Sequence, residues 1–213
     1  MSGDAGIDNV IGDGIHLYDD SVGGNDHVYG GDGGDWLYGD ATGLFNNSRG
    51  GDDQLSGGDG HDIIFGDAAT GDPTSKGGND ELFGDAGNDE LYGDFGWGPS
   101  IMSGVGGDDR LDGGTGDDAL WGGGGNDTFK FERYSGLDAI FDFKNTGGEQ
   151  DKIDLSSYGL SFSNLKIYND GITHPLSPIG GLVPAAVIEL SPDDKIFVAW
   201  VDANDLSAAD FIF

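Results

Sequence analysis

The chain has 213 residues, a formal net charge of −31 at pH 7, 43 glycines and no cysteine. With only 9 Lys and Arg it lacks the basic surface that binds nucleic acid or anionic lipid, and without cysteine it cannot form disulfide, zinc–thiolate or iron–sulfur sites. No apolar run is long enough to span a bilayer, and residues 1–30 lack the regions of a signal peptide, so we expect a soluble polyanion that attracts cations.

The acidic residues and the glycines concentrate in the first part of the chain. Residues 1–130 hold 27 acids, 4 bases and 36 glycines, whereas residues 131–213 hold 13 acids, 5 bases and 7 glycines. We therefore predict two units with a boundary near Phe131: residues 1–130 and residues 131–213.

A nine-residue phrase recurs through residues 1–130, as in GGDGHDIIF from Gly57 and GDAGNDELY from Gly84. Two phrases and one insert together make a unit of 27 residues. The insert begins with Gly-Asp and precedes every second copy of the phrase. Position 8 of the phrase is always apolar. Position 6 is always aspartate: Asp8, Asp26, Asp35, Asp53, Asp62, Asp80, Asp89, Asp109, Asp118 and Asp127.

The residue types of the phrase predict an all-β fold. Glycines at positions 1, 2 and 4 allow a tight loop, and positions 7 to 9 form a short strand whose middle side chain faces a core. One phrase cannot bury that side chain alone, so the units must stack. We predict a right-handed parallel β-roll, or β-solenoid, with two thin sheets joined by turns along two edges.

Position 9 after the shorter loops is apolar and forms a ladder on the outer face of one sheet: Ile11, Tyr38, Phe65, Tyr92 and Trp121. Large bare apolar patches are unusual on monomers, so we expect the inserts to fold back over this ladder. The inserts supply apolar residues of their own: Leu17, Tyr18, Leu44, Phe45, Phe95, Trp97, Ile101 and Met102. The alternatives are a stripe that binds a partner or a glycan, and simple exposure.

Stacked turns would place one aspartate per layer every ~4.8 Å, which requires a cation between the layers. Calcium suits such a site because it takes 6–8 oxygens, carbonyls and carboxylates included, at flexible geometry. Magnesium demands stricter geometry and keeps its water, so it suits the site less well.

The phrase strongly resembles the glycine-rich nonapeptide of the RTX family of secreted bacterial proteins. The resemblance implies that each calcium lies between successive turns. One turn gives the carbonyls of positions 1 and 3, the next gives those of positions 2 and 4, and both give the position-6 carboxylate. The implied carbonyl ligands are Gly30, Gly31, Asp32, Gly33, Gly57, Gly58, Asp59, Gly60, Gly84, Asp85, Ala86, Gly87, Gly113, Gly114, Thr115 and Gly116.

We expect two edges with five loops each, and therefore roughly eight calcium ions in the gaps between loops. The short edge consists of loops 3–8, 30–35, 57–62, 84–89 and 113–118. The long edge consists of the longer loops that end at Asp26, Asp53, Asp80, Asp109 and Asp127. On the long edge, positions 1 and 2 fall on residues such as Ser48 and Arg49, so those carbonyls are less certain ligands.

Residues 131–213 resemble the segments that close RTX rolls. Asp138 and Asp151 are the expected final ligands, and four apolar side chains are expected to plug the open end of the core: Phe141, Phe143, Ile153 and Leu155. Short β-type runs follow at 165–168, 186–190 and 196–201, and residues 206–213 are expected to form a brief helix and a terminal strand.

The last four residues, Asp210, Phe211, Ile212 and Phe213, resemble the ending of type I secretion substrates. This predicts the type I secretion machinery as a partner and an extracellular location, reached without an N-terminal signal. The alternative is a final core strand.

No HExxH or GxSxG motif occurs, so we expect no enzyme activity from this chain itself. The favoured function is a calcium-binding module that is unfolded in the cytosol and folds outside the cell. One alternative is the C-terminal part of a secreted enzyme (a protease, lipase or polysaccharide epimerase) whose catalytic domain lies outside this chain. The other is an adhesive or matrix protein that self-associates through the uncapped N-terminal edge of the roll.

Overall fold

The computed structural model describes residues 1–97, 106–145, 148–172 and 183–213. Regular structure in these residues is β-strand, apart from the short 3-10 helices η2 (Ser156–Tyr158), η3 (Phe162–Asn164) and η4 (Ala208–Asp210). Within the same ranges, no helix has the length and apolar character needed to cross a membrane.

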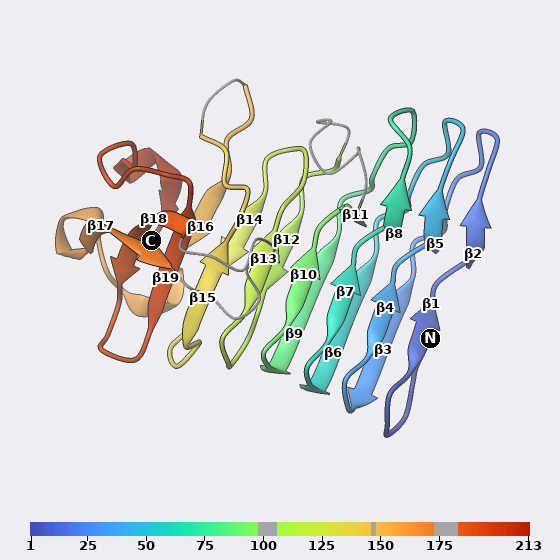
Figure 1. Cartoon of the computed structure of the whole chain (residues 1–213), viewed down its shortest axis with the longest axis horizontal. Helices are drawn as coiled ribbons and strands as arrows, with labels where there is room; N and C mark the ends of the chain where they lie inside the picture. Colours follow the sequence, from blue (N-terminus) through green and yellow to red (C-terminus); the bar gives the residue numbers. More distant parts are fainter. Residues whose placement is uncertain (98–105, 146–147, 173–182) are drawn as a thin grey trace.

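The strands stack in parallel layers, so that Figure 1 shows the chain advancing from the N-terminal end of a solenoid to a closed C-terminal end. Each of the first four layers contributes one strand to each of three sheets. The longest sheet has the order β1 (Asn9–Ile11), β4 (Trp36–Tyr38), β7 (Ile63–Phe65), β10 (Glu90–Tyr92), β13 (Ala119–Trp121), β15 (Leu137–Ile140), β19 (Lys195–Ala199), β18 (Val183–Glu189) and β17 (Lys166–Ile172).

The second sheet faces the first across the core. Its order is β20 (Phe211–Ile212), β16 (Lys152–Asp154), β14 (Thr128–Lys130), β12 (Arg110–Asp112), β9 (Glu81–Gly87), β6 (Gln54–Gly60) and β3 (His27–Asp32).

Strand register follows the sequence repeat. Ile64 of β7 pairs with Leu37 of β4 and with Leu91 of β10, and all three side chains are fully buried. The equivalent position of the second sheet holds Leu55 and Leu82, which are also fully buried. The two rows of position-8 side chains belong to one core cluster. The prediction of an all-β parallel β-roll is therefore confirmed.

A third sheet, which the nine-residue pattern does not predict, is built by the inserts: β11 (Phe95–Trp97), β8 (Ala68–Gly71), β5 (Ala41–Leu44) and β2 (Gly14–Leu17). The inserts rise along the upper side of Figure 1. They pack on the apolar ladder, because a side chain at Gly96 of β11 would run into the ring of Phe65. Phe65 has no exposed surface and stacks on Tyr38 at 5.2 Å and on Tyr92 at 5.1 Å between ring centroids.

The inserts thus fold back over the ladder, as expected, but Leu17, Leu44 and Phe95 form a cluster of their own and do not join it. Two of their expected apolar residues, Ile101 and Met102, lie outside the described residues.

The C-terminal part extends two of the sheets and closes the roll. β15 and β16 continue the parallel stacks, and β17, β18 and β19 add an antiparallel meander at the end, close to the three predicted β-runs. Phe143, Ile153 and Leu155 join the main core as predicted. Phe141 instead prolongs the outer ladder by stacking on Trp121 at 4.7 Å. η4 followed by β20 matches the brief helix and terminal strand expected there.

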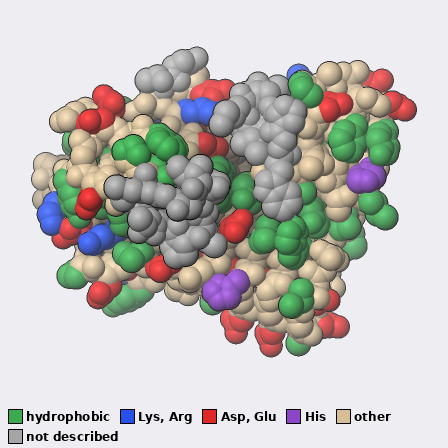
Figure 2. Space-filling view, viewed as in Figure 1, with side chains coloured by type: hydrophobic (Ala, Val, Ile, Leu, Met, Phe, Trp, Pro, Cys, Tyr) green, Lys and Arg blue, Asp and Glu red, His purple; other side chains and the backbone are tan. Residues whose placement is uncertain are grey.

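Charge is distributed unevenly over the surface. In Figure 2 red acidic side chains gather along the lower rim of the solenoid, where Figure 1 places the short-edge loops. Blue Lys and Arg side chains lie mainly toward the C-terminal end.

Candidate metal centre

The position-6 aspartates of the short edge form a continuous ladder along the roll. The backbone N–H of each aspartate donates to Oδ1 of the aspartate in the next layer at 2.7–3.1 Å. The successive members are Asp8, Asp35, Asp62, Asp89, Asp118 and Asp138. Each carboxylate therefore uses one oxygen to hold the neighbouring layer in register.

The other carboxylate oxygen in these layers has no donor. Oδ2 of Asp35, Asp62, Asp89, Asp118 and Asp138 is buried and accepts no hydrogen bond. Burying an unpaired anionic oxygen is costly, because it loses its hydration and gains nothing in return. These oxygens therefore mark points where a cationic partner fits.

Glycine at position 1 leaves room beside each of these oxygens. A Cβ placed on Gly30 would lie 2.6 Å from Oδ2 of Asp35, and closer still to the carbonyl oxygen of Gly57 in the next layer. Gly57 has the same relation to Asp62 and to the carbonyl of Gly84. A carboxylate and a carbonyl from adjacent layers therefore face one small space, which only glycine leaves open.

The long edge repeats this arrangement. The N–H groups of Asp26, Asp53, Asp80, Asp109 and Asp127 donate at 2.7–3.0 Å to Oδ1 of Asp53, Asp80, Asp109, Asp127 and Asp151. Oδ2 of Asp53, Asp80 and Asp109 is buried and has no hydrogen-bond partner.

The placement of Ser48 and Arg49 at positions 1 and 2 of the long edge was wrong. A Cβ on Gly39 would meet Oδ2 of Asp53 and the carbonyl of Gly66, the relation that Gly30 has on the short edge. Position 1 is therefore Gly39. The phrase is split: the insert leaves after position 2 and returns before position 3, at Gly50.

The split places an additional aspartate at position 2 of each of the four long-edge loops that carry an insert. Asp40 and Asp67 have no exposed surface, and Asp94 is 3% exposed. The nine-residue pattern identified these residues only as the start of the inserts. Their signal was the 27-residue spacing from Asp13 to Asp40 to Asp67 to Asp94, which equals the period of the roll.

Burial raises the pKa of position-6 carboxyl groups on both edges above the ordinary value of 3.8. The pKa rises to about 6 for Asp62, to about 7 for Asp53 and Asp118, and to about 8 for Asp89 and Asp127. For Asp80, Asp109 and Asp138 burial raises the pKa well above that value. The calcium-free roll therefore disfavours the charged form of the acids that line it.

The ends of the two ladders differ from the middle. Asp8 and Asp26, in the first layer, are only half-buried. At the other end Asp138 keeps a free Oδ2, whereas Oδ2 of Asp151 accepts the N–H of Lys144 at 2.7 Å. Of the two expected final ligands, Asp138 thus has the free oxygen that a metal needs.

Several predicted carbonyl ligands have exposed side chains. Asp32, Asp59, Asp85 and Thr115 lie on the rim of the short edge. Their carbonyl oxygens accept N–H groups of neighbouring layers, as Asp32 does from Gly6 and Asp59 from Gly33 at 2.7 Å each. The ligand role expected for these carbonyls stays a prediction.

The donors at both edges are all oxygen, which suits a hard cation such as calcium. In the described ranges, no three His, Cys, Asp or Glu side chains are grouped as a metal site. No Lys or Arg ion pair in the same residues reaches the position-6 aspartates. The chain therefore supplies oxygens for a cation but no cation of its own at these positions.

A family model of the RTX calcium-binding nonapeptide repeat matches the chain in four copies, at residues 22–41, 48–70, 75–97 and 101–130. The chain contains RTX calcium-binding nonapeptide repeats. Its repeats are thus hemolysin-type calcium-binding repeats, a structural calcium-binding module. No curated protein sequence matches the chain.

Two solved structures resemble this RTX roll. One is the solution structure of the AlgE6R3 subunit of the Azotobacter vinelandii mannuronan C5-epimerase, at 29% identity and a TM-score of 0.33, covering 76% of this chain and 78% of that one. The other is the extracellular lipase LipA of Serratia marcescens, at 19% identity and a TM-score of 0.38. That match covers 89% of this chain and 38% of the lipase, so the chain spans well under half of the lipase's length.

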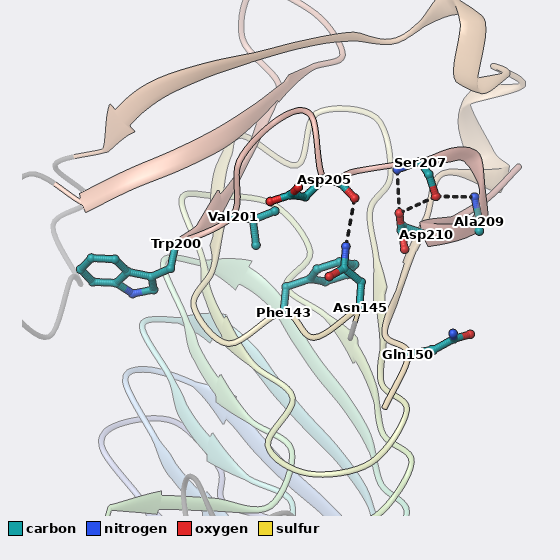
Figure 3. Close-up of a pocket in the computed structure, with 9 residues that line it drawn as sticks. All are labelled: Phe143, Asn145, Gln150, Trp200, Val201, Asp205, Ser207, Ala209 and Asp210. Atoms are coloured by element: carbon teal, nitrogen blue, oxygen red, sulfur yellow. Dashed lines mark hydrogen bonds between the residues drawn. The ribbon is translucent and has the colours of Figure 1, made fainter. Parts of the chain in front are cut away.

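Asp210, the first residue of the predicted secretion signal, lines a pocket at the C-terminal end of the roll (Figure 3). Oδ2 of Asp210 accepts the N–H and the hydroxyl of Ser207 at 2.7 and 2.9 Å and so caps η4. Phe211 is buried, and its strand β20 pairs with β16. Ile212 and Phe213 are each 40% exposed. In the folded protein this segment is a terminal strand.

Proposed function

We propose that this RTX roll is a calcium-dependent folding module of a secreted protein, in which residues 1–130 form the ion-binding roll and residues 131–213 close it. The observation that carries the proposal is the buried Oδ2 without a partner in successive layers of both edges. Such oxygens are costly in a metal-free roll and become ligands in a loaded one.

The proposed ligands follow the register of the structure. On the short edge, Asp35 and Asp62 share one gap with the carbonyls of positions 1 to 4, and the gaps from Asp62 to Asp89 and from Asp89 to Asp118 repeat this set. Asp118 and Asp138 form one more gap. Roughly eight ions in total is the number expected from both edges.

Calcium would couple binding to folding in this chain. Residues 1–130 carry 27 acids against 4 bases, so the charges repel one another in any compact state. An ion between two layers offsets that repulsion, and the complete ligand set exists only in the folded roll, so the free energy of binding adds to the free energy of folding.

A calcium titration followed by circular dichroism tests the proposal. We expect little β signal in chelator and a cooperative gain as calcium is added, together with protection from proteolysis. The matched control is magnesium at the same ionic strength, which should produce a much smaller change. A chain with the same β signal in chelator and in calcium would contradict the proposal.

Secretion by the type I route is part of the proposal, and the burial of Phe211 supports one feature of it. Because Phe211 packs 5.5 Å from Phe162 between ring centroids, a receptor reaches it only before the chain folds. A cytosol at low calcium would keep the chain open. In a host with a type I transporter, removing residues 210–213 should retain the protein inside the cell, whereas removing the exposed Met1 and Ser2 should not. Equal export of both variants would contradict the role of this segment.

Self-association is a second candidate function, favoured by the first layer. β1 and β2 lie at the ends of their sheets with one neighbouring strand each, and the apolar side chains of Ile7, Ile15 and Val22 are 69–82% exposed there. An open strand edge is a template for pairing with a second copy. Light scattering in calcium should show a dimer that Ile15→Lys weakens; a monomer at all concentrations would exclude it.

A further inference from the structure

The position-2 aspartates of the long edge form a second column of buried acids, separate from the position-6 ladder. Asp40, Asp67 and Asp94 each follow the position-1 glycine and precede the insert strand. In the fifth layer, which has no insert, position 2 is Gly123, with a φ of +94°. The acids therefore occur only where the insert carries the backbone out of the loop.

Asp67 is the member that the structure singles out. It has no exposed surface, and its Oδ1 accepts the N–H of Gly78 at 2.9 Å. Its Oδ2 is buried and has no hydrogen-bond partner. Asp40 and Asp94, one layer away on either side, accept the N–H groups of Gly51 and Gly107 through Oδ1. Their Oδ2 atoms accept as well: that of Asp40 from Gly51 at 3.2 Å and that of Asp94 from Gly124 at 2.8 Å.

The column runs through the gaps between layers. A Cβ on Gly50 would lie 2.6 Å from Oδ2 of Asp40 and would also meet Oδ1 of Asp67. A Cβ on Gly77 would meet Oδ2 of Asp67 and Oδ1 of Asp94. Carboxylates from two successive layers thus face one glycine, which leaves between them a space lined by oxygen.

This space lacks a positive charge except at the C-terminal end of the column. There Lys144 donates its ammonium to the carbonyl of Gly123, the position-2 residue of the fifth layer, and pairs with Glu149 at 3.0 Å. None of the described ion pairs reaches Asp40, Asp67 or Asp94. The chain provides a cation where the column ends and leaves the inner layers for one from solution.

We propose that Asp67, with Asp40 and Asp94 in the flanking layers, binds calcium between the layers of the long edge through its side-chain carboxylate. This inference rests on the proposed calcium-dependent folding and adds ligands that the nonapeptide phrase does not contain. The backbone carbonyl of Asp67 already accepts the N–H groups of Asp40 and Ala41 at 3.1 and 3.3 Å, and the carboxylate of position 2 supplies oxygen for an ion instead. Long-edge sites then carry more negative charge than short-edge sites, which have only the position-6 acids.

Three matched variants test the inference: Asp67→Asn, Asp62→Asn and Asp193→Asn. All three remove one negative charge. Asp62 belongs to the short-edge ladder, and Asp193 is exposed in the loop between β18 and β19. Bound calcium is counted by native mass spectrometry and by titration calorimetry on the full chain.

We expect Asp67→Asn and Asp62→Asn each to lose at least one ion and Asp193→Asn to keep the wild-type number. Loss with Asp62→Asn but not with Asp67→Asn would overturn this inference and leave the proposed function standing. No loss with either variant would count against both.

A second measurement does not depend on a variant folding. In calcium-loaded crystals of the wild-type chain, anomalous scattering should place a calcium ion about 2.3–2.6 Å from Oδ2 of Asp67. A water molecule at that point, with ions present along the short edge, would show that Asp67 is buried as a neutral acid and would overturn the inference. Crystals without ions on either edge would overturn the proposed function as well.

Discussion

Each inner position-6 aspartate divides its two oxygens between two tasks. Oδ1 of Asp62 accepts the N–H of Asp35 at 2.7 Å and so fixes the spacing of two layers, whereas Oδ2 faces the space beside Gly57. Replacing the side chain by asparagine would keep the size but leave only one carbonyl oxygen. The aspartate is therefore needed for both its acceptor count and its charge.

The small space between Gly30 and Oδ2 of Asp35 predicts a specific effect of adding one methyl group at Gly30. Gly30→Ala places a Cβ 2.6 Å from Oδ2 of Asp35, so the carboxylate must shift out of position. We expect calcium affinity at that gap to fall by roughly tenfold, as for other changes that misplace a metal ligand. Calorimetric titration of the full chain measures the loss.

Gly14→Ala is the matched control for this substitution. A Cβ added to Gly14 in β2 would have no atom within 4 Å, and the φ of this residue is not positive, so the change should leave calcium binding at the wild-type level. Equal binding by both alanine variants would show that the space beside Gly30 holds no ion.

The raised pKa values predict that acid promotes folding when calcium is absent. In the roll the pKa of Asp53 is about 7 and that of Asp89 about 8, against 3.8 for an ordinary aspartate, so the folded chain holds more protons than the open chain between these values. The free energy of unfolding therefore rises as the pH falls from about 8 to about 4. Circular dichroism in chelator should show more β signal at about pH 5 than at about pH 8.

With calcium present the same groups predict a release of protons. Protons compete with calcium for the carboxylates, so calcium that binds the acid-folded roll must displace the protons that these groups hold. Calorimetric titration at about pH 5, in two buffers of different ionisation enthalpy, measures that release. No release of protons, or an acid-unfolded chain in chelator, would contradict this assignment of the raised pKa values.

At the scale of single elements, the strands are too short to be stable alone. β4, β7 and β10 have three residues each, and each contributes one side chain to the central core and one to the outer ladder. Stability must therefore come from stacking layer on layer, as in other repeat proteins. The insert strands matter because they turn the outer ladder from a surface into a second core.

The ladder predicts a large loss of stability at its centre. Phe65→Ala removes a fully buried ring that stacks on Tyr38 and Tyr92 and lies beneath Gly96. We expect the free energy of unfolding in saturating calcium to fall by about 3–5 kcal/mol, measured by chemical denaturation. Ile7→Ala, at a side chain 82% exposed, is the control and should change it by less than about 0.5 kcal/mol. A similar small change in both variants would mean that the inserts do not cover the ladder.

Structural features that repeat within nine residues could be predicted from the sequence. Features that depend on contacts between inserts could not. The core row through Leu37 and Ile64 and the ladder through Asp35 and Asp62 follow from the phrase itself. The third sheet does not, because β5 and β8 are recognisable only once the 27-residue layers are stacked. Ser48 and Arg49 were assigned to the loop for the same reason. When an insert interrupts the phrase between positions 2 and 3, the nine residues are no longer consecutive in the sequence.

At the scale of the whole molecule, charge and closure are separated along the chain. Residues 1–130 carry a net charge of −23, and the C-terminal part brings Lys144 to the end of the long edge and β19 to the end of the longest parallel stack. Its apolar residues also join the core of the roll, as Phe129 and Phe143 show with ring centroids 6.3 Å apart. The first complete layers to form therefore have a ready template at the C-terminal end.

Because the negative charge is concentrated in residues 1–130, we expect calcium to determine how compact the full chain is. In chelator, self-repulsion should hold the protein near the radius of gyration of an open chain of this length, ~50 Å, and calcium should reduce it toward the ~17 Å of a compact one. Small-angle X-ray scattering measures both states. Screening by sodium chloride or magnesium at equal ionic strength lowers repulsion without completing the ligand sets, so it should give only partial compaction. Equal compaction by sodium and by calcium would show that charge screening, and not the ions held between layers, builds the roll.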